Sequence, residues 1–296
     1  MERINNHKGT DRETDFLKGR RDEIKRRVIF YVSFFATFFH IVAHGNKELL
    51  VGFLLGSSLC CLFVFEGVEK LLFPGKGNVR RDRSCFFSFS AILVLLLSAD
   101  YLFFQRTEGN QIGRMDGVLL LFLLLVFLFL EFRNRREPFR EGFLEWKKLL
   151  GEGKDFKRFL FQVLLIVICI SVGSYFLVDG LIGVCIEYHI RFSLAGVLFL
   201  PWAVHIVNFI YSREEEAMER MRDAMSFDVV LLYLGSFGLG AVLLPLSISY
   251  EIIFSFIMMS VFSILLVWRD KVSERVAGSL MLTMYVAGVV GVLMWM

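Results

Sequence analysis

The sequence predicts an all-α polytopic membrane protein with about nine transmembrane helices in two inverted-topology repeats. Three observations support this prediction. Hydrophobic residues make up 56% of the 296 residues and aromatic residues 15%, whereas soluble domains are roughly 45–50% apolar. The apolar residues form continuous runs of membrane-spanning length, without the alternation of a membrane β-barrel. The basic residues lie almost entirely between these runs, on alternate connections.

Nine runs are long enough to cross a bilayer as a helix, which takes about 17–25 residues. The first is short, and the fifth is long enough to be broken near Gly173 or Gly180. The runs lie approximately at residues 28–44, 48–69, 84–104, 115–132, 159–188, 192–212, 224–244, 248–268 and 276–296.

The basic residues indicate an orientation for these spans. When alternate connections are assigned to opposite sides, 29 of the 33 Lys and Arg residues fall on one side. The other side receives only Lys47, Arg106, Arg114 and Arg191. Since cytoplasmic loops carry the excess of Lys and Arg, we expect a cytoplasmic N-terminus and an exoplasmic C-terminus. The membrane itself is left open.

The connections also suggest a division of the chain. Residues 1–27 form a polar cytosolic tail, 28–132 a first repeat of four spans, 133–158 a basic linker and 159–296 a second repeat of five spans. Apolar residues recur in the linker at three- and four-residue spacing, which fits an amphipathic helix at the cytoplasmic interface. A solvated linker is the alternative. The recurring residues are Phe139, Phe143, Trp146 and Leu150.

An internal repeat appears when the chain is shifted against itself. A shift of 168 residues lays 55–67 over 223–235 without gaps and pairs Ser58 with Ser226. The predicted sides give these two segments opposite directions across the membrane, so the repeats are inverted. Four spans against five imply that the first repeat lacks its first helix.

A second similarity lies at the end of each half. The fourth predicted span opens with Arg114-Met-Asp-Gly117, and the ninth opens with Arg275-Val-Ala-Gly278. Each of these starts is followed by an apolar helix.

Together with Leu54-Leu-Gly-Ser-Ser58 and Leu200-Pro201, these features resemble the sodium/calcium exchanger (cation/calcium antiporter) superfamily. The resemblance covers nearly the whole chain from about residue 28. It implies cation antiport, with Ca²⁺ or Na⁺ as transported ions and no cofactor. The ions would bind in an oxygen cage between the two halves, because hard cations prefer oxygen ligands.

The resemblance also implies positions for that ion pathway. The family's Gly-Ser-Asn-x-x-Asn/Asp motif falls on residues 56–61 and 224–229, and the proline of its Thr-Ser-x-Pro-Glu motif falls on Pro201. Neither copy of the first motif keeps its Asn. The implied pathway positions are Ser57, Ser58, Cys61, Ser226, Asp228 and Pro201.

Both acidic positions of the family are aromatic in this chain. Trp202 follows Pro201 where the family has Glu, and the same spacing counted back from Ser58 reaches Phe34. A desolvated divalent ion would lose about two unit charges of compensation there. The question for the structure is whether the centre is a polar cavity or is plugged by Phe34 and Trp202.

Other ionisable residues lie in or near the spans, where they are functional candidates. Asp228 and Glu66 are candidates for the pathway, although Glu66 is near enough to the cytoplasmic end to snorkel. His205 and His40 could titrate or bind a transition metal, or simply be hydrogen-bonded in the bundle. Interfacial positions are expected for Asp100, Asp179 and Glu187.

Two functions remain open from the sequence. The first is a cation antiporter, with calcium as the implied ion and a divergent site. The second is a transport-inactive relative that serves as a membrane scaffold or regulatory subunit. Intramembrane enzyme motifs and CxxC metal spacing are absent, and the basic residues do not form a nucleic-acid surface. The lipid bilayer is the expected partner, and a second copy or another membrane protein is left open.

Overall fold

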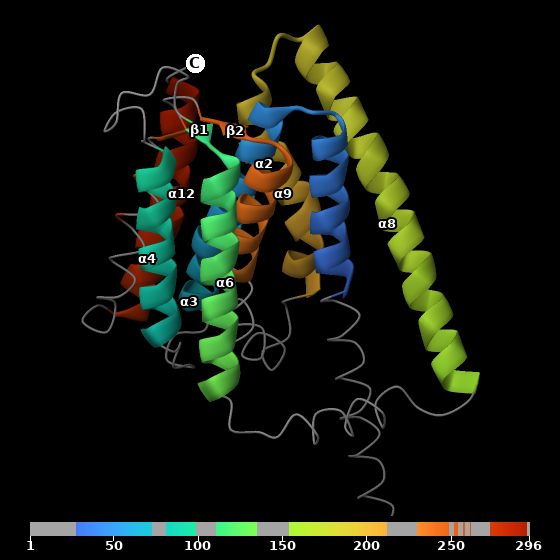
Figure 1. The fold of residues 1–296 in the computed structure, drawn as a ribbon, viewed down its shortest axis with the longest axis horizontal. Coiled ribbons are helices and arrows are strands. Elements are labelled where there is room, and N and C mark those ends of the chain that lie inside the picture. The colour runs from blue at the N-terminus through green and yellow to red at the C-terminus, as the bar shows by residue number, and fades with distance from the viewer. Residues whose placement is uncertain are drawn as a thin grey trace, which may run out of the picture.

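The computed structural model describes residues 28–72, 81–98, 111–134, 154–211, 230–248, 252–253, 257, 261 and 273–294. Within these residues the chain is a bundle of helices with one short two-stranded sheet at one end (Figure 1). The helices α2 and α9 lie at the centre of the bundle, and α8 leans away from it.

The Val28–Ala43 helix and α2 (Lys47–Leu59) form a hairpin because the short turn between them stops one helix and starts the next. Gly45 has a φ of 67°, the left-handed conformation that commonly ends a helix. The side chain of Asn46 then accepts a hydrogen bond from the Leu49 N–H at 3.0 Å, which caps the start of α2.

The second predicted span, 48–69, is one continuous helical segment. It consists of α2, the π-helix η1 (Cys60–Phe65) and α3 (Glu66–Leu72). Lys70, which the charge count places in a loop, lies instead in α3 and is buried, with its Nζ donating to Met281 Sδ at 3.8 Å. A long aliphatic stem allows such a lysine to pack within a helix near its end.

Two further helices, α4 (Arg81–Ser98) and α6 (Arg114–Asn134), stand side by side in the bundle (Figure 1). Strand β1 (Gln111–Ile112) directly precedes α6 and pairs antiparallel with β2 (Leu246–Ser247). This pairing ties the start of α6 to the segment that follows the Val230–Leu243 helix.

The fifth span, for which the sequence left a break open, is continuous, because α8 (Lys154–Glu187) is unbroken over 34 residues. A Cβ added to Gly173 or Gly180 would meet nothing within 4 Å, so neither glycine is required by a neighbouring element. A glycine costs a helix only about 1 kcal/mol, and the surrounding apolar residues keep the helix intact.

A tight turn then reverses the chain into α9 (Phe192–Tyr211). His189 adopts a φ of 55°, and the Ile190 N–H donates to the Cys185 carbonyl oxygen at 2.9 Å. A residue in the left-handed conformation, followed by an N–H that bonds to the carbonyl oxygen five residues earlier, is the Schellman motif that ends many helices. Glycine is the usual residue at that position, and histidine takes it here.

Glycines bring two pairs of helices into backbone contact. A Cβ on Gly117 of α6 would lie 2.7 Å from the Gly238 carbonyl oxygen of the Val230–Leu243 helix. A Cβ on Gly278 of α12 (Glu274–Met294) would lie 2.7 Å from the Gly67 carbonyl oxygen of α3. These positions admit no side chain without separation of the helices.

Aromatic side chains fill the core between the first two helices and the Val230–Leu243 helix. Phe34 stacks on Phe53 with ring centroids 5.0 Å apart, and Tyr233 contacts Phe237 at the same distance. These four rings and Phe38 are at most 1% exposed.

The described helices overlap the predicted spans, although α4 and α8 begin three and five residues earlier and α3 ends three residues later. The eighth span, 248–268, lies mostly outside the described residues, so the count of nine remains a prediction. The tail at 1–27 and the central part of the linker also lie outside the described residues.

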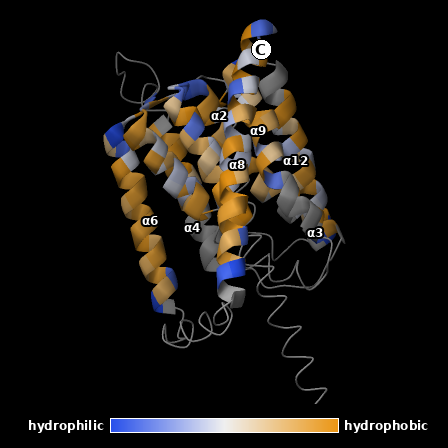
Figure 2. Cartoon of the chain, turned by 90° about the vertical axis from the view of Figure 1, so that its right-hand side faces the viewer, coloured by the Kyte–Doolittle hydropathy of each residue, from blue (hydrophilic) through white to orange (hydrophobic). Residues whose placement is uncertain are grey.

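The exterior is apolar along the helices (Figure 2). Two described helices are long and apolar enough to cross a membrane, Arg114–Arg133 and Lys157–Glu187. Their exposed side chains include Phe129 and Phe132 on α6 and Phe161 and Phe176 on α8, each at least 65% exposed. Exposed apolar surface of this extent marks a membrane or protein contact.

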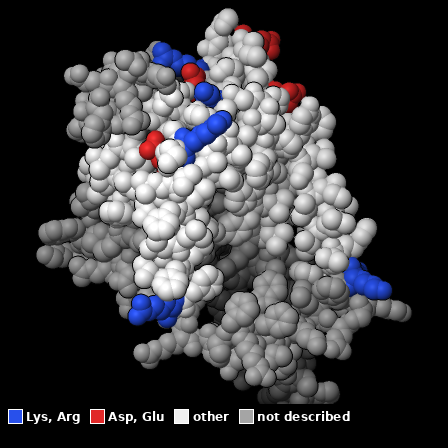
Figure 3. Space-filling model, in the orientation of Figure 1, with Lys and Arg blue, Asp and Glu red and all other residues white. Residues whose placement is uncertain are grey.

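The described charged side chains lie toward the two ends of the face shown in Figure 3, and the band between them is uncharged among these residues. In Figure 1, α6 ends where α8 and α12 begin, at the end of the bundle opposite to the sheet. Arg133 near the end of α6, Arg158 near the start of α8 and Arg275 near the start of α12 therefore lie at the same end of the bundle. This agrees with the alternation used in the charge count; the side that faces the cytoplasm remains a prediction.

Candidate functional site

We place the candidate site where α2 crosses α9. Glycines on both helices leave no side chain between them there, so the two backbones come into contact. A Cβ on Gly56 would clash with the Val197 carbonyl oxygen and lie 2.7 Å from Pro201 Cγ. From the other side, a Cβ on Gly196 would lie 2.6 Å from the Leu49 carbonyl oxygen. The resemblance placed Pro201 and the 56–61 motif in the ion pathway, and the structure brings the two together.

Four polar side chains are buried at this crossing. We name them the α2–α9 polar cluster: Ser57, Ser58, Cys61 and His205. Cys61 Sγ lies 3.6 Å from His205 Nδ1 and 3.7 Å from Nε2, although 144 residues separate the two. Ser58 Oγ donates to the Leu54 carbonyl oxygen at 2.9 Å.

Ser57 differs from Ser58 in its hydrogen bonding. Its side chain is 2% exposed, and its Oγ has no hydrogen-bond partner among the described residues. Thr37, on the neighbouring Val28–Ala43 helix, also has a buried hydroxyl without a hydrogen-bond partner among the described residues. A buried hydroxyl without a partner loses free energy relative to one in water, so such groups are candidates for contact with a bound ion or water.

The π-helix η1 begins directly at this cluster and separates two neighbouring thiols. Cys61 contacts His205 of α9, whereas Cys60 packs with Tyr285 of α12. π-Helical segments are rare and frequently occur at functional sites. Adjacent side chains on a helix point about 100° apart, so these two thiols reach two different helices.

The two positions where the resemblance implies an acidic residue have different environments. Phe34 is 1% exposed and stacks on Phe53, so it fills the core at the first position. Trp202 is 40% exposed, and its Nε1 donates to Tyr285 Oη at 2.9 Å. Of these two residues only Phe34 is buried in the core, and Trp202 does not plug it, because its indole is directed toward Tyr285 of α12.

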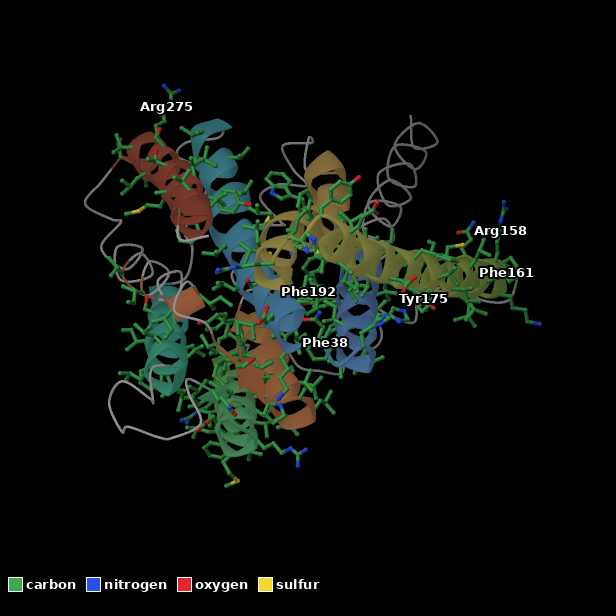
Figure 4. The ribbon with its side chains drawn as sticks, turned by 90° about the horizontal axis from the view of Figure 1, so that it is seen from above. Phe38, Arg158, Phe161, Tyr175, Phe192 and Arg275 are labelled. Carbon is green, nitrogen blue, oxygen red and sulfur yellow. The ribbon has the colours of Figure 1, made fainter. Side chains whose placement is uncertain are left out.

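The other sequence candidates lie apart from this cluster. His40 Nε2 lies 3.1 Å from the Ser171 carbonyl oxygen, and its ring contacts Tyr175, so it links the first helix to α8. Asp179 and Glu187 are exposed on α8. Figure 4 shows Tyr175 on the part of α8 nearer the bundle and Phe161 at the far end, away from Phe38 at the centre.

Several predicted site residues remain untested. Ser226, Asp228 and Asp100 lie outside the described residues, and the side chain of Glu66 is not described.

Sequence reasoning missed the approach of His205 to Cys61 and the buried hydroxyl of Thr37. A signal was available in the 168-residue shift, which pairs Thr37 with His205. Both residues stand three positions after a lost acidic position, which is one helical turn. The predicted repeat therefore singles out His205, which lies in the cluster, together with Thr37.

Comparison of this fold with solved structures finds the sodium-calcium exchanger NCX_Mj at 14% identity, with 90% of this chain and 84% of that chain covered and a TM-score of 0.58. YfkE matches at 15% identity, with 93% and 87% covered and a TM-score of 0.62; a selenium-substituted form of this Ca²⁺/H⁺ antiporter gives 0.58. The chain has the fold of these exchangers.

Both neighbours are transporters and not enzymes. With the apolar exterior, the shared fold is that of an integral multi-pass membrane protein. No protein-family model matches the chain, and no curated protein is similar to it in sequence.

Proposed function

We propose that the protein is an integral membrane cation antiporter of the exchanger fold with a divergent central site. The observation that carries this proposal is the burial of Ser57, Cys61 and His205 at the α2–α9 crossing, where the exchanger motif positions fall. In an apolar bundle, buried polar side chains within a span are expensive and tend to mark substrate or ion pathways.

Reciprocal contacts support the two inverted repeats that such a mechanism uses. Gly117 of the fourth predicted span contacts Gly238 of the seventh, and Gly278 of the ninth contacts Gly67 of the second. A two-fold axis that exchanges the second span with the seventh and the fourth with the ninth would turn the contact between the fourth and seventh spans into the contact between the ninth and second. Inverted repeats of this kind place substrate sites at their interface and allow alternating access.

The chemistry of the cluster favours a monovalent cation over calcium. Residues 49–65 and 192–211 contain no Asp or Glu, so these segments offer no carboxylate to a bound ion. A Ca²⁺ ion takes six to eight oxygen ligands, several of them carboxylates, and these two segments supply none to balance its double charge. We therefore expect flux of monovalent cations to exceed flux of Ca²⁺.

A flux assay in proteoliposomes tests the proposal. The purified chain is reconstituted, a Na⁺ or proton gradient is imposed, and uptake of Ca²⁺ and of a panel of monovalent cations is compared with empty liposomes. We expect gradient-driven uptake, which Ser57→Ala lowers and Ser279→Ala does not. Ser279 is an exposed hydroxyl on α12 that donates to the Arg275 carbonyl oxygen, so it is a matched control. Absence of flux for every cation would overturn the proposal.

A transport-inactive relative is the second candidate, favoured by the ring of Phe34 at an expected acidic position. Such a protein would act in the membrane as a scaffold or regulatory subunit. Phe34→Ala would then change stability or the binding of a membrane partner, and neither the wild type nor the variant would move any cation. Cation flux by the wild type excludes this candidate.

A further inference from the structure

The pair formed by Cys61 and His205 has a chemistry that the exchanger resemblance does not assign. His205 is fully buried and Cys61 is 7% exposed. The ring of Phe30 covers the imidazole, with ring centroids 5.1 Å apart. Cys61 lies fourteen residues after the start of α2 at Lys47, which is about 20 Å along the helix, so the pair lies well inside the span.

We propose that Cys61 and His205 form a binding site for one soft monovalent d¹⁰ metal ion, of which Cu(I) is the representative. Thiolate ligands select Cu(I), Zn²⁺ and iron–sulfur clusters, and imidazole suits copper and zinc. A structural zinc site uses four ligands and a catalytic one uses three protein ligands. Among the described residues no group of three or more His, Cys, Asp or Glu side chains could hold a metal, and Cu(I) needs only two.

Charge balance also selects a monovalent ion. A thiolate carries one negative charge and a neutral imidazole carries none, so the complex with a monovalent cation is neutral. The same pair would leave a divalent ion with one uncompensated charge, which is costly in an apolar interior. The neutral complex is therefore the one that this surrounding tolerates.

Binding exchanges the ion for a proton. The thiol of Cys61 loses its proton, the sulfur forms a bond to the ion, and a nitrogen of His205 forms the second bond, while the metal keeps its oxidation state. Metal binding to thiols releases protons in this way. If the ion is also transported, a soft monovalent metal ion is the substrate of the proposed antiporter. Transport of the ion rests on the proposed function, whereas binding of the ion does not. It supplies an ion-for-proton coupling of one to one.

The two groups are close enough for one ion to bridge them after a small movement. With bonds of about 2.3 Å to sulfur and about 2.0 Å to nitrogen, the values for zinc, a near-linear two-coordinate ion holds its two ligand atoms about 4.3 Å apart. The observed separations of 3.6 and 3.7 Å are shorter, so the side chains move apart on binding. The sulfur is nearly equidistant from both nitrogens, so it lies over the ring, and rotation of the ring turns one nitrogen to the ion.

An independent observation points to the same place. Ser57 lies four residues before Cys61, which on a helix is the same face one turn earlier. Its hydroxyl is buried and has no hydrogen-bond partner among the described residues. A hydroxyl on this face can donate a hydrogen bond to the thiolate that the ion requires, because a thiolate is a stronger acceptor than a thiol.

Cu(I) binding to the purified full chain tests the proposal. The protein in detergent is titrated without oxygen against a chromogenic Cu(I) chelator, and X-ray absorption at the copper edge reports the ligand atoms. We expect one Cu(I) per chain with one sulfur and one nitrogen ligand. Cys61→Ser and His205→Gln should each weaken binding by more than about 100-fold, the upper end of the loss for an outer-shell partner.

Two matched controls keep the test specific. Cys60→Ser removes the adjacent thiol, which faces Tyr285, and Cys169→Ser removes an exposed thiol on α8; both should bind like the wild type. Cys61→Ala, compared by thermal stability, separates loss of a ligand from loss of folding. Wild-type Cu(I) affinity in folded Cys61 variants, or no Cu(I) bound by the wild type, would overturn the inference.

Flux measurements separate this inference from the proposed function. Cu(I) binding without any cation flux refutes the antiporter and leaves the binding site. Cation flux that is unchanged in Cys61→Ser and is accompanied by no Cu(I) binding refutes the site and leaves the antiporter.

Discussion

Replacing Gly56 by alanine should destabilise the protein by separating α2 from α9. The added methyl would lie 2.7 Å from Pro201 Cγ and from Val197 Cα, whereas carbon atoms pack best at about 3.5–4.0 Å. The two helices must therefore move apart by about 1 Å. Overpacking of this kind costs about 1–3 kcal/mol, and the better helix propensity of alanine returns only about 0.5–1 kcal/mol.

The net loss of about 0–2.5 kcal/mol corresponds to a fall in melting temperature of up to roughly 10 °C, at about 2–4 °C per kcal/mol. Fluorescence-detected size-exclusion chromatography after heating in detergent measures it. Gly173→Ala on α8 is the matched control, because a Cβ there meets nothing within 4 Å, and it should melt at or slightly above the wild-type temperature. Equal melting of the Gly56 and Gly173 variants would refute the close-packing argument.

Three further predictions use the same assay. Gly278→Ala should lower the melting temperature because its Cβ would lie 2.7 Å from a carbonyl oxygen of α3, whereas Gly288→Ala, with open space around it, should not. Trp202→Phe should cost about 0.5–1.5 kcal/mol through loss of the bond to Tyr285, and adding Tyr285→Phe should cost little more; additive losses would contradict this. Asn46→Ala removes the cap of α2 and should cost about 1 kcal/mol, which Asn46→Asp should restore.

The positions of the helices could be predicted from the sequence because bilayer thickness fixes how long an apolar run must be. The starts of α6 and α12 fall within two residues of the predicted spans at 115 and 276. The continuity of α8 could not be predicted, because a glycine weakens a helix without breaking it and only the surroundings decide the outcome.

The site could be predicted only in part. The resemblance placed Ser57 and Pro201 in the ion pathway, and the structure brings their helices into contact beside Gly56; their role remains a prediction. The outward direction of Trp202 depends on how α9 is rotated against α2, and that rotation is set by Gly196 and Gly56 packing on the opposite helix. Hydrophobicity alone does not give the rotation, so the contact of Cys61 with His205 was visible only in three dimensions.

The length of α8 has a consequence for the bilayer around the protein. Its apolar stretch from Phe159 to Ile186 is about 42 Å long at 1.5 Å per residue, against a hydrocarbon core of about 30 Å, so a tilt near 45° matches the two. The buried side chains of α8, Ser174, Val178 and Cys185, all lie in its second half. The first half of α8 has no buried side chain among the described residues, so a thicker bilayer can be accommodated when this helix becomes more upright while the α2–α9 crossing keeps its geometry.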